Sequence, residues 1–437
     1  MTLRLRSKGV LVGVCAVAAI GAAACGSSSS SSSTSSSSPA STQAATTSTS
    51  ASGSSGGASS AALGTPNAAK GSPVVFGMIN IETNPGVDFP EIREAAQATI
   101  AYVNAYRGGL DGHPIQLNFC ATDGSPATSS SCANKLIADH PVAIMGASDL
   151  ASADTLPLYK KAGLALIGGM DLTPAESSAP NSVIFNDVAQ SGNSDIGVYA
   201  VKTLNAKKVS VIAVGDTQGI FQAKNYEVPS VQQSGGTAKL YSLPPSVADA
   251  SSVVASALGN SPDAILLESP SQCVSILTAL KSLGNSKPIL SIDPCSAPSV
   301  IKAAAGGANG MYWFEPYQDL FAADQTPDVI LTKAILAKYA PAKIIVDSPA
   351  LAGVSTVMDI WQAFHTTPVS KLNSTYMLKV LKTGSHPAFL STTYDCNGQS
   401  ILKEPAICSA NEYLYQIKGT TPTLLQSNYD AGANIGG

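Results

Sequence analysis

One stretch, residues 142–173, constrains the fold of this chain more than any other. It contains two short apolar runs, Val142–Met145 and Leu164–Ile167, and each run ends at a glycine. A small polar loop and a helix-length segment separate the two runs, which predicts two buried parallel strands joined by a helix. In open parallel sheets, ligands bind beyond the carboxyl ends of the strands. The loops that follow these runs are therefore a candidate ligand cradle.

Both loops carry hydrogen-bonding side chains. Ser148, Asp149 and Ser152 follow the first run, and Asp171 and Thr173 follow the second. Hydroxyl and carboxyl groups placed at one edge of a sheet suit the binding of a small polar solute.

The same alternation of strands and helices continues along the chain. The first series has expected strands at 73–81, 114–121, 142–145, 164–167 and 181–186. The second has them at 208–214, 238–243, 263–268, 288–293 and 310–315, with one helix expected over 219–234. Two successive series of similar size predict an α/β protein with two doubly wound lobes. The last part is expected to hold helices near 327–340, 350–366 and 373–384, and then strands at 388–394, 412–418 and 421–425.

The N-terminus carries an export signal. Arg4, Arg6 and Lys8 precede an apolar run, 10–24, that is too short to span a bilayer comfortably. Small residues stand directly before Cys25, as in a bacterial lipobox, which predicts a lipoprotein signal peptide over 1–25 and lipidation of Cys25. Ordinary secretion with a free Cys25 is the alternative.

A polar, low-complexity segment follows the signal. Residues 26–69 contain no charged side chain and consist mainly of Ser, Thr, Ala and Gly. So little apolar surface cannot offset chain entropy, so we expect a disordered Ser-rich tether over 26–72. About 365 residues remain for the folded body, which is enough for two domains.

Charge and hydropathy exclude two classes of partner for the body. Removing the signal takes away three cations and moves the net charge from −4 to −7, so we expect no binding of nucleic acid. No later apolar stretch reaches membrane-spanning length.

Six cysteines lie in the body, an even number in an exported chain, which predicts disulfides. Closeness in sequence favours the pairs Cys120–Cys132, Cys273–Cys295 and Cys396–Cys408, although six cysteines allow 15 connectivities. Zinc binding is the alternative role for these cysteines. No CxxC pair is present and the four histidines are scattered, so we expect no metal site and no cofactor.

Three stretches together resemble one family. EIREAAQATIAYVNAYRGGLDGHPIQL is similar to its first helix and following strand, ATDGSPATSSSCANKLIADHPVAIMG to its Asp-containing loop, helix and strand, and YDCNGQS with YLYQIKG to its closing strands. The chain from Pro73 onward thus resembles the type I periplasmic-binding fold, and within it the branched-chain amino-acid (Leu/Ile/Val-type) binding proteins of ABC importers.

The resemblance implies two lobes that are joined by three crossing segments and close on a ligand. The first lobe is expected over 73–190 and 316–375, and the second over 191–315 and 376–437. The implied partners are a small solute and an ABC permease with its ATPases. We expect a monomer that is lipid-anchored to the outer face of the cytoplasmic membrane.

The resemblance also implies site residues. Ser148 or Ser152, the amides of Met170 and Asp171, and Thr173 would hold an amino acid's carboxylate. Asp293 would hold its ammonium group, unless this side chain serves only the turn before Pro294. Phe89 and Phe221 occupy loops that line the family's side-chain pocket, although Phe221 suits core packing as well, as does Trp313. Asp149 or Asp171 would repel a carboxylate, so amides, aromatic acids and other solutes remain alternative ligands.

Two other functions remain open. A lipid-anchored sensor would share the fold without a transporter. An enzyme is not expected, because the chain has no convincing nucleophile elbow, P-loop, HExxH or Ser-x-x-Lys set and no GxGxxG after its first strand.

Overall fold

The computed structural model describes residues 61–84, 87–245, 247–268, 272–292 and 295–432. The predicted signal peptide, Cys25, Asp293 and most of the predicted tether lie outside these residues. Within the described ranges, no helix is both long and apolar enough to cross a membrane.

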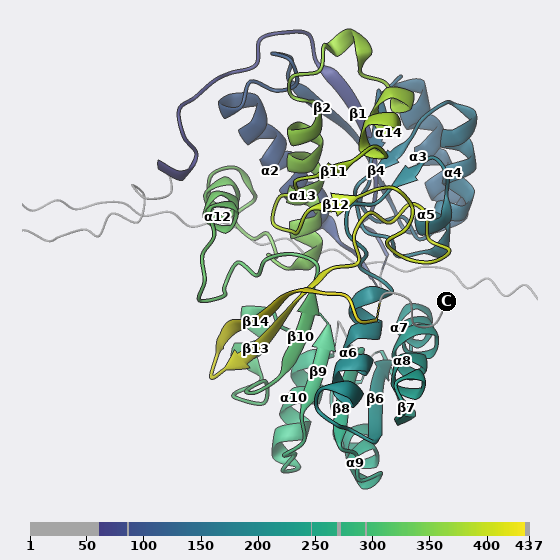
Figure 1. Cartoon of the computed structure of the whole chain (residues 1–437), viewed down its shortest axis with the longest axis vertical. Helices are drawn as coiled ribbons and strands as arrows, with labels where there is room; N and C mark the ends of the chain where they lie inside the picture. The colour runs from purple at the N-terminus through teal and green to yellow at the C-terminus, as the bar shows by residue number, and fades with distance from the viewer. Residues whose placement is uncertain (1–60, 85–86, 246, 269–271, 293–294, 433–437) are drawn as a thin grey trace, which may run out of the picture. The chain divides into compact units, whose positions relative to one another are not determined.

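The first lobe is built on a five-stranded parallel sheet with the order β2-β1-β3-β4-β5. β1 is buried along nearly its whole length, as expected for a parallel strand covered on both faces. Figure 1 shows helices on either side of this sheet. In chain order the elements are β1 (Val74–Ile81), α2 (Pro90–Tyr106), β2 (Ile115–Thr122), α3 (Pro126–Ala138), β3 (Ala143–Met145), α4 (Ser152–Lys161), β4 (Leu166–Ile167), α5 (Pro174–Ser178) and β5 (Ser182–Val183).

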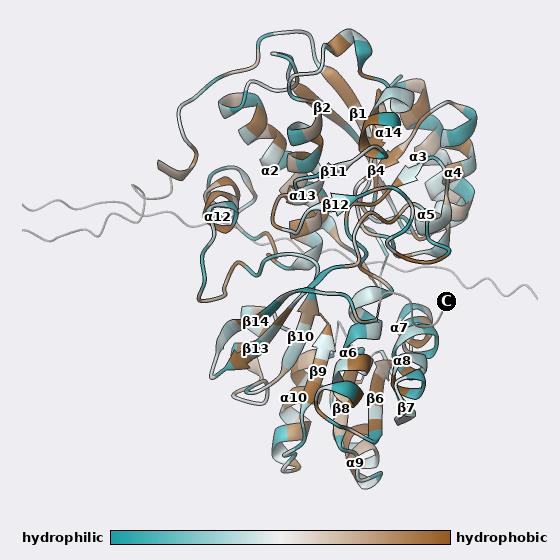
Figure 2. Cartoon of the chain, in the orientation of Figure 1, coloured by the Kyte–Doolittle hydropathy of each residue, from teal (hydrophilic) through white to brown (hydrophobic). Residues whose placement is uncertain are grey.

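The second lobe has a seven-stranded sheet with the order β14-β13-β10-β9-β8-β6-β7, in which only β13 and β14 run antiparallel to their neighbours. Apolar residues concentrate in β6 and β8 (Figure 2). Nearly every residue of these two strands is buried, so both faces of the sheet are covered there. Its elements are α6 (Ser191–Lys202), β6 (Lys208–Val214), α7 (Thr217–Gln222), the π-helix η1 (Ala223–Glu227), α8 (Val228–Gln233), β7 (Thr237–Leu243), α9 (Ser251–Gly259), β8 (Ala264–Glu268), α10 (Cys273–Ser282), β9 (Ile289–Ile292), α11 (Pro298–Ala303) and β10 (Tyr312–Glu315), followed late in the chain by β13 (Glu412–Lys418) and β14 (Thr421–Tyr429).

The segment after β10 returns to the first lobe. Buried residues of α12 (Pro327–Tyr339), α13 (Ser348–Phe364) and α14 (Ser374–Leu381) share a core with α2 and β1. A short 3-10 turn, η2 (Val369–Lys371), and a two-stranded sheet of β11 (Ser385–His386) and β12 (Tyr394–Asp395) complete this part. The chain therefore crosses between the lobes three times, through 184–190, 316–326 and 408–411.

The fold class is confirmed, and so are the three disulfides that sequence closeness favoured. The expected helix over 219–234 is instead divided into α7, η1 and α8. Pro229 lies in this segment and has no N–H to donate, and the backbone widens to a π turn just before it.

Two expected boundaries differ from the packing in the structure. Phe389, Tyr394 and Cys408 are buried in the first lobe's core, so much of 376–437 belongs to that lobe and only the final hairpin to the second. The expected strand over 388–394 is mostly irregular, because Leu390 has a positive φ of 61°.

The expected tether also ends earlier than residue 72. Leu63 is buried in the first lobe's core. The Asn67 N–H donates to the Ala105 carbonyl at 3.0 Å, and the Ala69 N–H donates to that of Asn104 at 2.8 Å. One buried side chain and a run of backbone hydrogen bonds are enough to fix this segment against the end of α2.

Helix α13 lies so close to α2 that position 353 must be glycine. A Cβ atom on Gly353 would lie 2.2 Å from the Ile92 carbonyl oxygen. We expect Gly353→Ala to lower the free energy of unfolding by about 2 kcal/mol, because the two helices must move apart. Gly259→Ala is the matched control: its Cβ would meet nothing within 4 Å, so urea unfolding should show no loss of stability there.

Candidate functional site

The loops after β1, β3 and β4 meet at one edge of the first lobe's sheet. The Ile81 N–H donates to the Ser148 carbonyl at 3.0 Å, and the Met170 N–H donates to the Ala147 carbonyl at 2.9 Å. Backbone hydrogen bonds therefore join the loops of the predicted cradle into one continuous surface. The Met170 amide, which we expected to bind ligand, is already used inside it.

Glycines allow this close approach. A Cβ atom on Gly146 would lie 1.9 Å from the Gly168 carbonyl oxygen, and Gly169 has a φ of +87°. The Gly169 N–H donates to Thr356 Oγ1 at 2.9 Å, which fixes the second loop to α13. Glycine is needed here because no side chain fits between the two backbones.

Ser148 is the hydroxyl in this cradle that remains available. Its side chain is 1% exposed, and its Oγ has no hydrogen-bond partner among the described residues. Ser152 instead bonds to Thr173, and Thr173 also forms the capping box of α5 with Glu176. A buried hydroxyl without a partner costs free energy, and a bound ligand could supply that partner.

Asp149 faces away from a ligand in this cradle. Its carboxylate accepts hydrogen bonds from Ser129 Oγ at 2.8 Å, Thr155 Oγ1 at 2.7 Å and the Ala151 N–H at 3.1 Å. The expected repulsion between Asp149 and a ligand carboxylate is therefore reduced, because this acid is bound inside the first lobe.

Asp171 belongs to a cluster of three acids. One carboxylate oxygen from each of Asp171, Asp187 and Glu404 lies within 4.8 Å of the others. The three come from the loop after β4, the first crossing segment and the loop closed by the Cys396–Cys408 disulfide. They are also the only group of His, Cys, Asp and Glu side chains in the described part of the chain that could hold a metal ion.

Local hydrogen bonds fix two of these acids. Asp171 Oδ1 accepts the Val188 N–H at 2.8 Å, and Asp187 accepts the Ser191 Oγ–H at 2.5 Å at the start of α6. Glu404 Oε2 has no partner among the described residues. None of the three forms an ion pair with a described basic residue.

This arrangement disfavours negative charge. Burial and then the neighbouring Asp187 hold the pKa of Asp171 well above its usual value. The same two causes raise the pKa of Glu404 to about 8. Carboxyls this close cannot all ionise cheaply unless a cation joins them, so the cluster is suited to bind positive charge.

The second lobe contributes to this region through α7 and η1. The Gln218 side-chain amide donates to the Leu172 carbonyl at 3.3 Å, next to Asp171. Tyr226 is only 8% exposed, and burial is the main reason why the pKa of its phenol is raised. The negative charges of Glu404, Asp187 and Asp171 raise this pKa further. Residues from both lobes therefore surround the acid cluster.

The predicted aromatic residues are only partly joined to this site. Phe221 is half-buried and meets Tyr226 edge-on, with ring centroids 5.9 Å apart. Phe89 is half-buried against the first lobe's core, and its carbonyl accepts the Asn80 side-chain amide at 2.7 Å. Trp313 is fully buried in the second lobe, which agrees with the core-packing alternative.

Sequence reasoning missed Asp187, Glu404, Gln218 and Tyr226. Asp187 follows the predicted strand 181–186 directly, so its place on a crossing segment was the one available signal. Glu404 lies more than 200 residues away in sequence, and only the fold of the tail brings it to this loop.

Comparison with known proteins gives one family and many similar structures. A family model described as periplasmic binding protein matches residues 73–397. No curated protein matches the chain in sequence.

An ABC transporter substrate-binding protein from Sphaerobacter thermophilus has a similar structure, with a TM-score of 0.69 at 16% identity, covering 83% of this chain and 99% of that one. A leucine-binding protein from Thermotoga maritima gives 0.64 at 16% identity, covering 81% and 98%. A solute-binding protein from R. palustris in complex with 4-hydroxybenzoate gives 0.66 at 15% identity, covering 82% and 99%. At these identities the likeness concerns the fold.

Proposed function

Because the chain belongs to the periplasmic binding protein family, we propose that it is the extracytoplasmic solute-binding lipoprotein of an ABC importer and that it captures a small amine-bearing solute between its lobes. Amino acids, and the branched-chain type first, are the proposed class. Structurally similar proteins include a leucine-binding protein as well as binders of other solutes.

The observation that carries the solute class is the buried acid cluster of Asp171, Asp187 and Glu404. A primary ammonium group offers three hydrogen-bond donors and one positive charge, which matches three convergent carboxyls. Calcium ordinarily needs six to eight oxygen ligands, and two of these acids already accept bonds from the protein. An ammonium group is thus a better match than a metal ion.

Ser148 is the proposed partner for the other end of an amino acid. Its free, buried Oγ lies in the cradle loop joined to the Asp171 loop by the bond between Ser152 and Thr173. A ligand carboxylate could accept a hydrogen bond from this hydroxyl. Phe221 and Tyr226 would contact the apolar part of the solute.

Capture would require no chemistry beyond binding. Contacts made by Asp171 in the first lobe and by Tyr226 in the second can form together only when the lobes approach, so a ligand shifts the equilibrium toward closure by its difference in affinity for the two states. The three crossing segments would act as the hinge.

The proposal also includes the transporter and the membrane anchor. A permease with its ATPases would recognise the closed protein, which acts as a monomer. Lipidation at Cys25 and the Ser-rich tether would hold the binder near that permease and raise its effective concentration.

The test is a thermal-shift comparison of matched solutes. Leucine should stabilise the protein by about 2.7 kcal/mol at a hundred-fold excess over Kd. Its deaminated counterpart, 4-methylpentanoate, should give little stabilisation, because it presents no positive charge to the acid cluster. Valine, isoleucine and polar amino acids would define the preferred side chain.

Three outcomes would count against the proposal. Stabilisation by 4-hydroxybenzoate or a fatty acid, with none by any amine, would overturn the amine class. Stabilisation by calcium chloride that is lost in Glu404→Gln would make the cluster a metal site. If no solute in the panel raises the melting temperature, a sensor with a different ligand would be favoured.

A further inference from the structure

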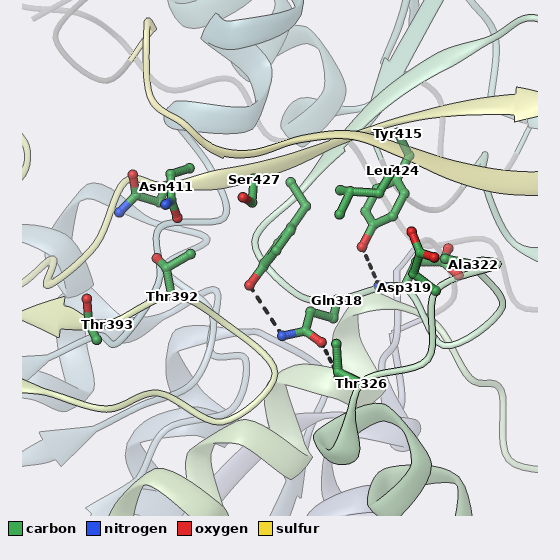
Figure 3. Close-up of a pocket in the computed structure, with 13 residues that line it drawn as sticks. Gln318, Asp319, Ala322, Thr326, Thr392, Thr393, Asn411, Tyr415, Leu424 and Ser427 are labelled. Atoms are coloured by element: carbon green, nitrogen blue, oxygen red, sulfur yellow. Dashed lines mark hydrogen bonds between the residues drawn. The ribbon is translucent and has the colours of Figure 1, made fainter.

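A cavity lies among the crossing segments and is separate from the acid cluster. Its volume is about 550 Å³, within the usual range for small-molecule sites. Figure 3 shows the side chains around it. The residues that line it are Gln318, Asp319, Ala322, Asp324, Thr326, Thr392, Thr393, Asn411, Tyr413, Tyr415, Leu424, Ser427 and Asn428. None of them belongs to the loops after β1, β3 or β4.

Both lobes supply walls of this cavity. Tyr413 and Tyr415 of β13, with Ser427 of β14, come from the second lobe. Thr326, which caps α12, and Thr392, which precedes β12, come from the first lobe. The shape of the cavity must therefore change when the lobes move.

Gln318 in the second crossing segment connects the two walls. Its side-chain amide N–H donates to the Tyr413 hydroxyl at 3.4 Å, and its carbonyl accepts the Thr326 hydroxyl (Figure 3). Tyr415 accepts the backbone N–H of Asp319 at 2.9 Å. These bonds cross the hinge, so an occupant beside them would favour one hinge geometry over another.

The lining chemistry selects a cation. Two carboxylates, Asp319 and Asp324, line the cavity together with hydroxyls and amides, and no Lys, Arg or His is among the lining residues. Burial lowers the pKa of Lys333, and the charge of Asp319 opposes that shift. The Lys333 ammonium donates to Gln325 Oε1 at 2.6 Å, and Lys333 is not a lining residue. Asp319 already accepts the Phe321 N–H, whereas Asp324 is exposed at the rim of the cavity. A small organic amine could place its ammonium group beside Asp324 and its other donors against the lining hydroxyls and amides.

We propose that this cavity, which we call the hinge cavity, is a second small-molecule site that binds a small organic amine and thereby biases the hinge. The ligand binds one arrangement of the lobes better than the other, because its contacts come from both. It shifts the population of closed protein by that difference.

Titration calorimetry with three four-carbon probes tests the charge requirement. Putrescine carries two ammonium groups, 1,4-butanediol is its uncharged counterpart, and succinate carries the opposite charge. We expect putrescine to bind and the other two to give no heat of binding. Equal affinity of butanediol and putrescine would overturn the amine class, and no binding of putrescine at millimolar concentration would overturn the site.

Variants of the whole protein locate the binding. Ser427→Phe should fill the hinge cavity and weaken putrescine binding at least tenfold, while Gln426→Phe, on the same strand but outside the lining, should leave it unchanged. Asp324→Asn should weaken it by about threefold, which is the scale of an exposed ion pair. Glu404→Gln should remove any binding of putrescine at the acid cluster, so the binding that persists in this variant reports the hinge cavity. The opposite pattern, with loss in Glu404→Gln and none in Ser427→Phe, would assign putrescine to the cluster and overturn the proposal.

Small-angle X-ray scattering tests the effect on the hinge. In the Glu404→Gln background, which removes amine binding at the acid cluster, putrescine should change the radius of gyration. The change should persist when Gln426→Phe is added and disappear when Ser427→Phe is added. Binding without any change in the radius of gyration would contradict the proposed effect on the lobes.

Discussion

Glu404→Gln should raise the stability of the empty protein and weaken its binding of ligand. In the empty protein Glu404 lies beside Asp171 and Asp187 with no cation, and burial raises its pKa to about 8. An amide of the same shape removes the repulsion and the cost of burying charge. We expect the melting temperature to rise and the affinity for an amine-bearing solute to fall at least tenfold, since a charge-assisted hydrogen bond is lost.

The opposite signs of the two effects make this prediction specific. A residue with a purely structural role would lose stability on substitution and keep its affinity. Asp249→Asn is the matched control, because it makes the same change from carboxyl to amide at an exposed acid of the second lobe. Melting temperature and calorimetric affinity should both stay unchanged in that control. A less stable Glu404→Gln protein with native affinity would refute the proposed role.

The second large effect is a loss of stability as the pH rises from about 5 to about 8. Burial raises the pKa of several carboxyls, to about 8 in Asp359, Glu268 and Glu404 and to about 7 in Glu91. Further acids whose pKa lies well above the usual value are Asp171, Glu176, Asp195, Glu227 and Glu412.

The sign follows from proton linkage. An acid with a raised pKa in the folded state binds its proton more tightly there than in the unfolded chain. Its contribution to stability is complete below the unfolded pKa near 4 and is lost as the pH rises through the folded value. Few acids shift the other way, and among these Asp249 and Asp263 are exposed. The summed loss should be on the order of several kcal/mol.

Urea unfolding at pH 5, 6, 7 and 8 measures this dependence. Asp359→Asn should flatten part of the curve, because Asp359 is fully buried and accepts the Ser355 hydroxyl at 2.8 Å and the Phe389 N–H at 2.7 Å, contacts that an amide can largely retain. The exposed Asp249→Asn should leave the curve unchanged. Stability that is constant, or that increases, between pH 5 and pH 8 would contradict this prediction.

The sequence was most informative where local pattern and tertiary environment agree. Buried parallel strands are continuous apolar runs, and the glycines at 146, 168 and 169 mark the loops that approach closely, so both sheets and the cradle could be anticipated. Paired cysteines close in sequence also identified the three disulfides.

The rest depended on contacts that no local pattern encodes. Residues near Phe389 and Tyr394 read as a strand but pack irregularly in the first lobe, because tertiary contacts outweigh strand propensity. Glu404 reaches Asp171 only through that packing. The split helix around Tyr226 depends on how one turn accommodates Pro229, which changes the direction of the side chains in this segment.

The most direct test of the central claim is a crystal structure of the protein with its tightest-binding amine solute. We expect the ammonium nitrogen to lie within about 3.2 Å of carboxylate oxygens from Asp171, Asp187 or Glu404, with the two lobes closed around the solute. For an amino acid, the carboxylate should accept a hydrogen bond from Ser148. A solute held elsewhere between the lobes, with the acid cluster filled by water or a metal ion, would contradict the account.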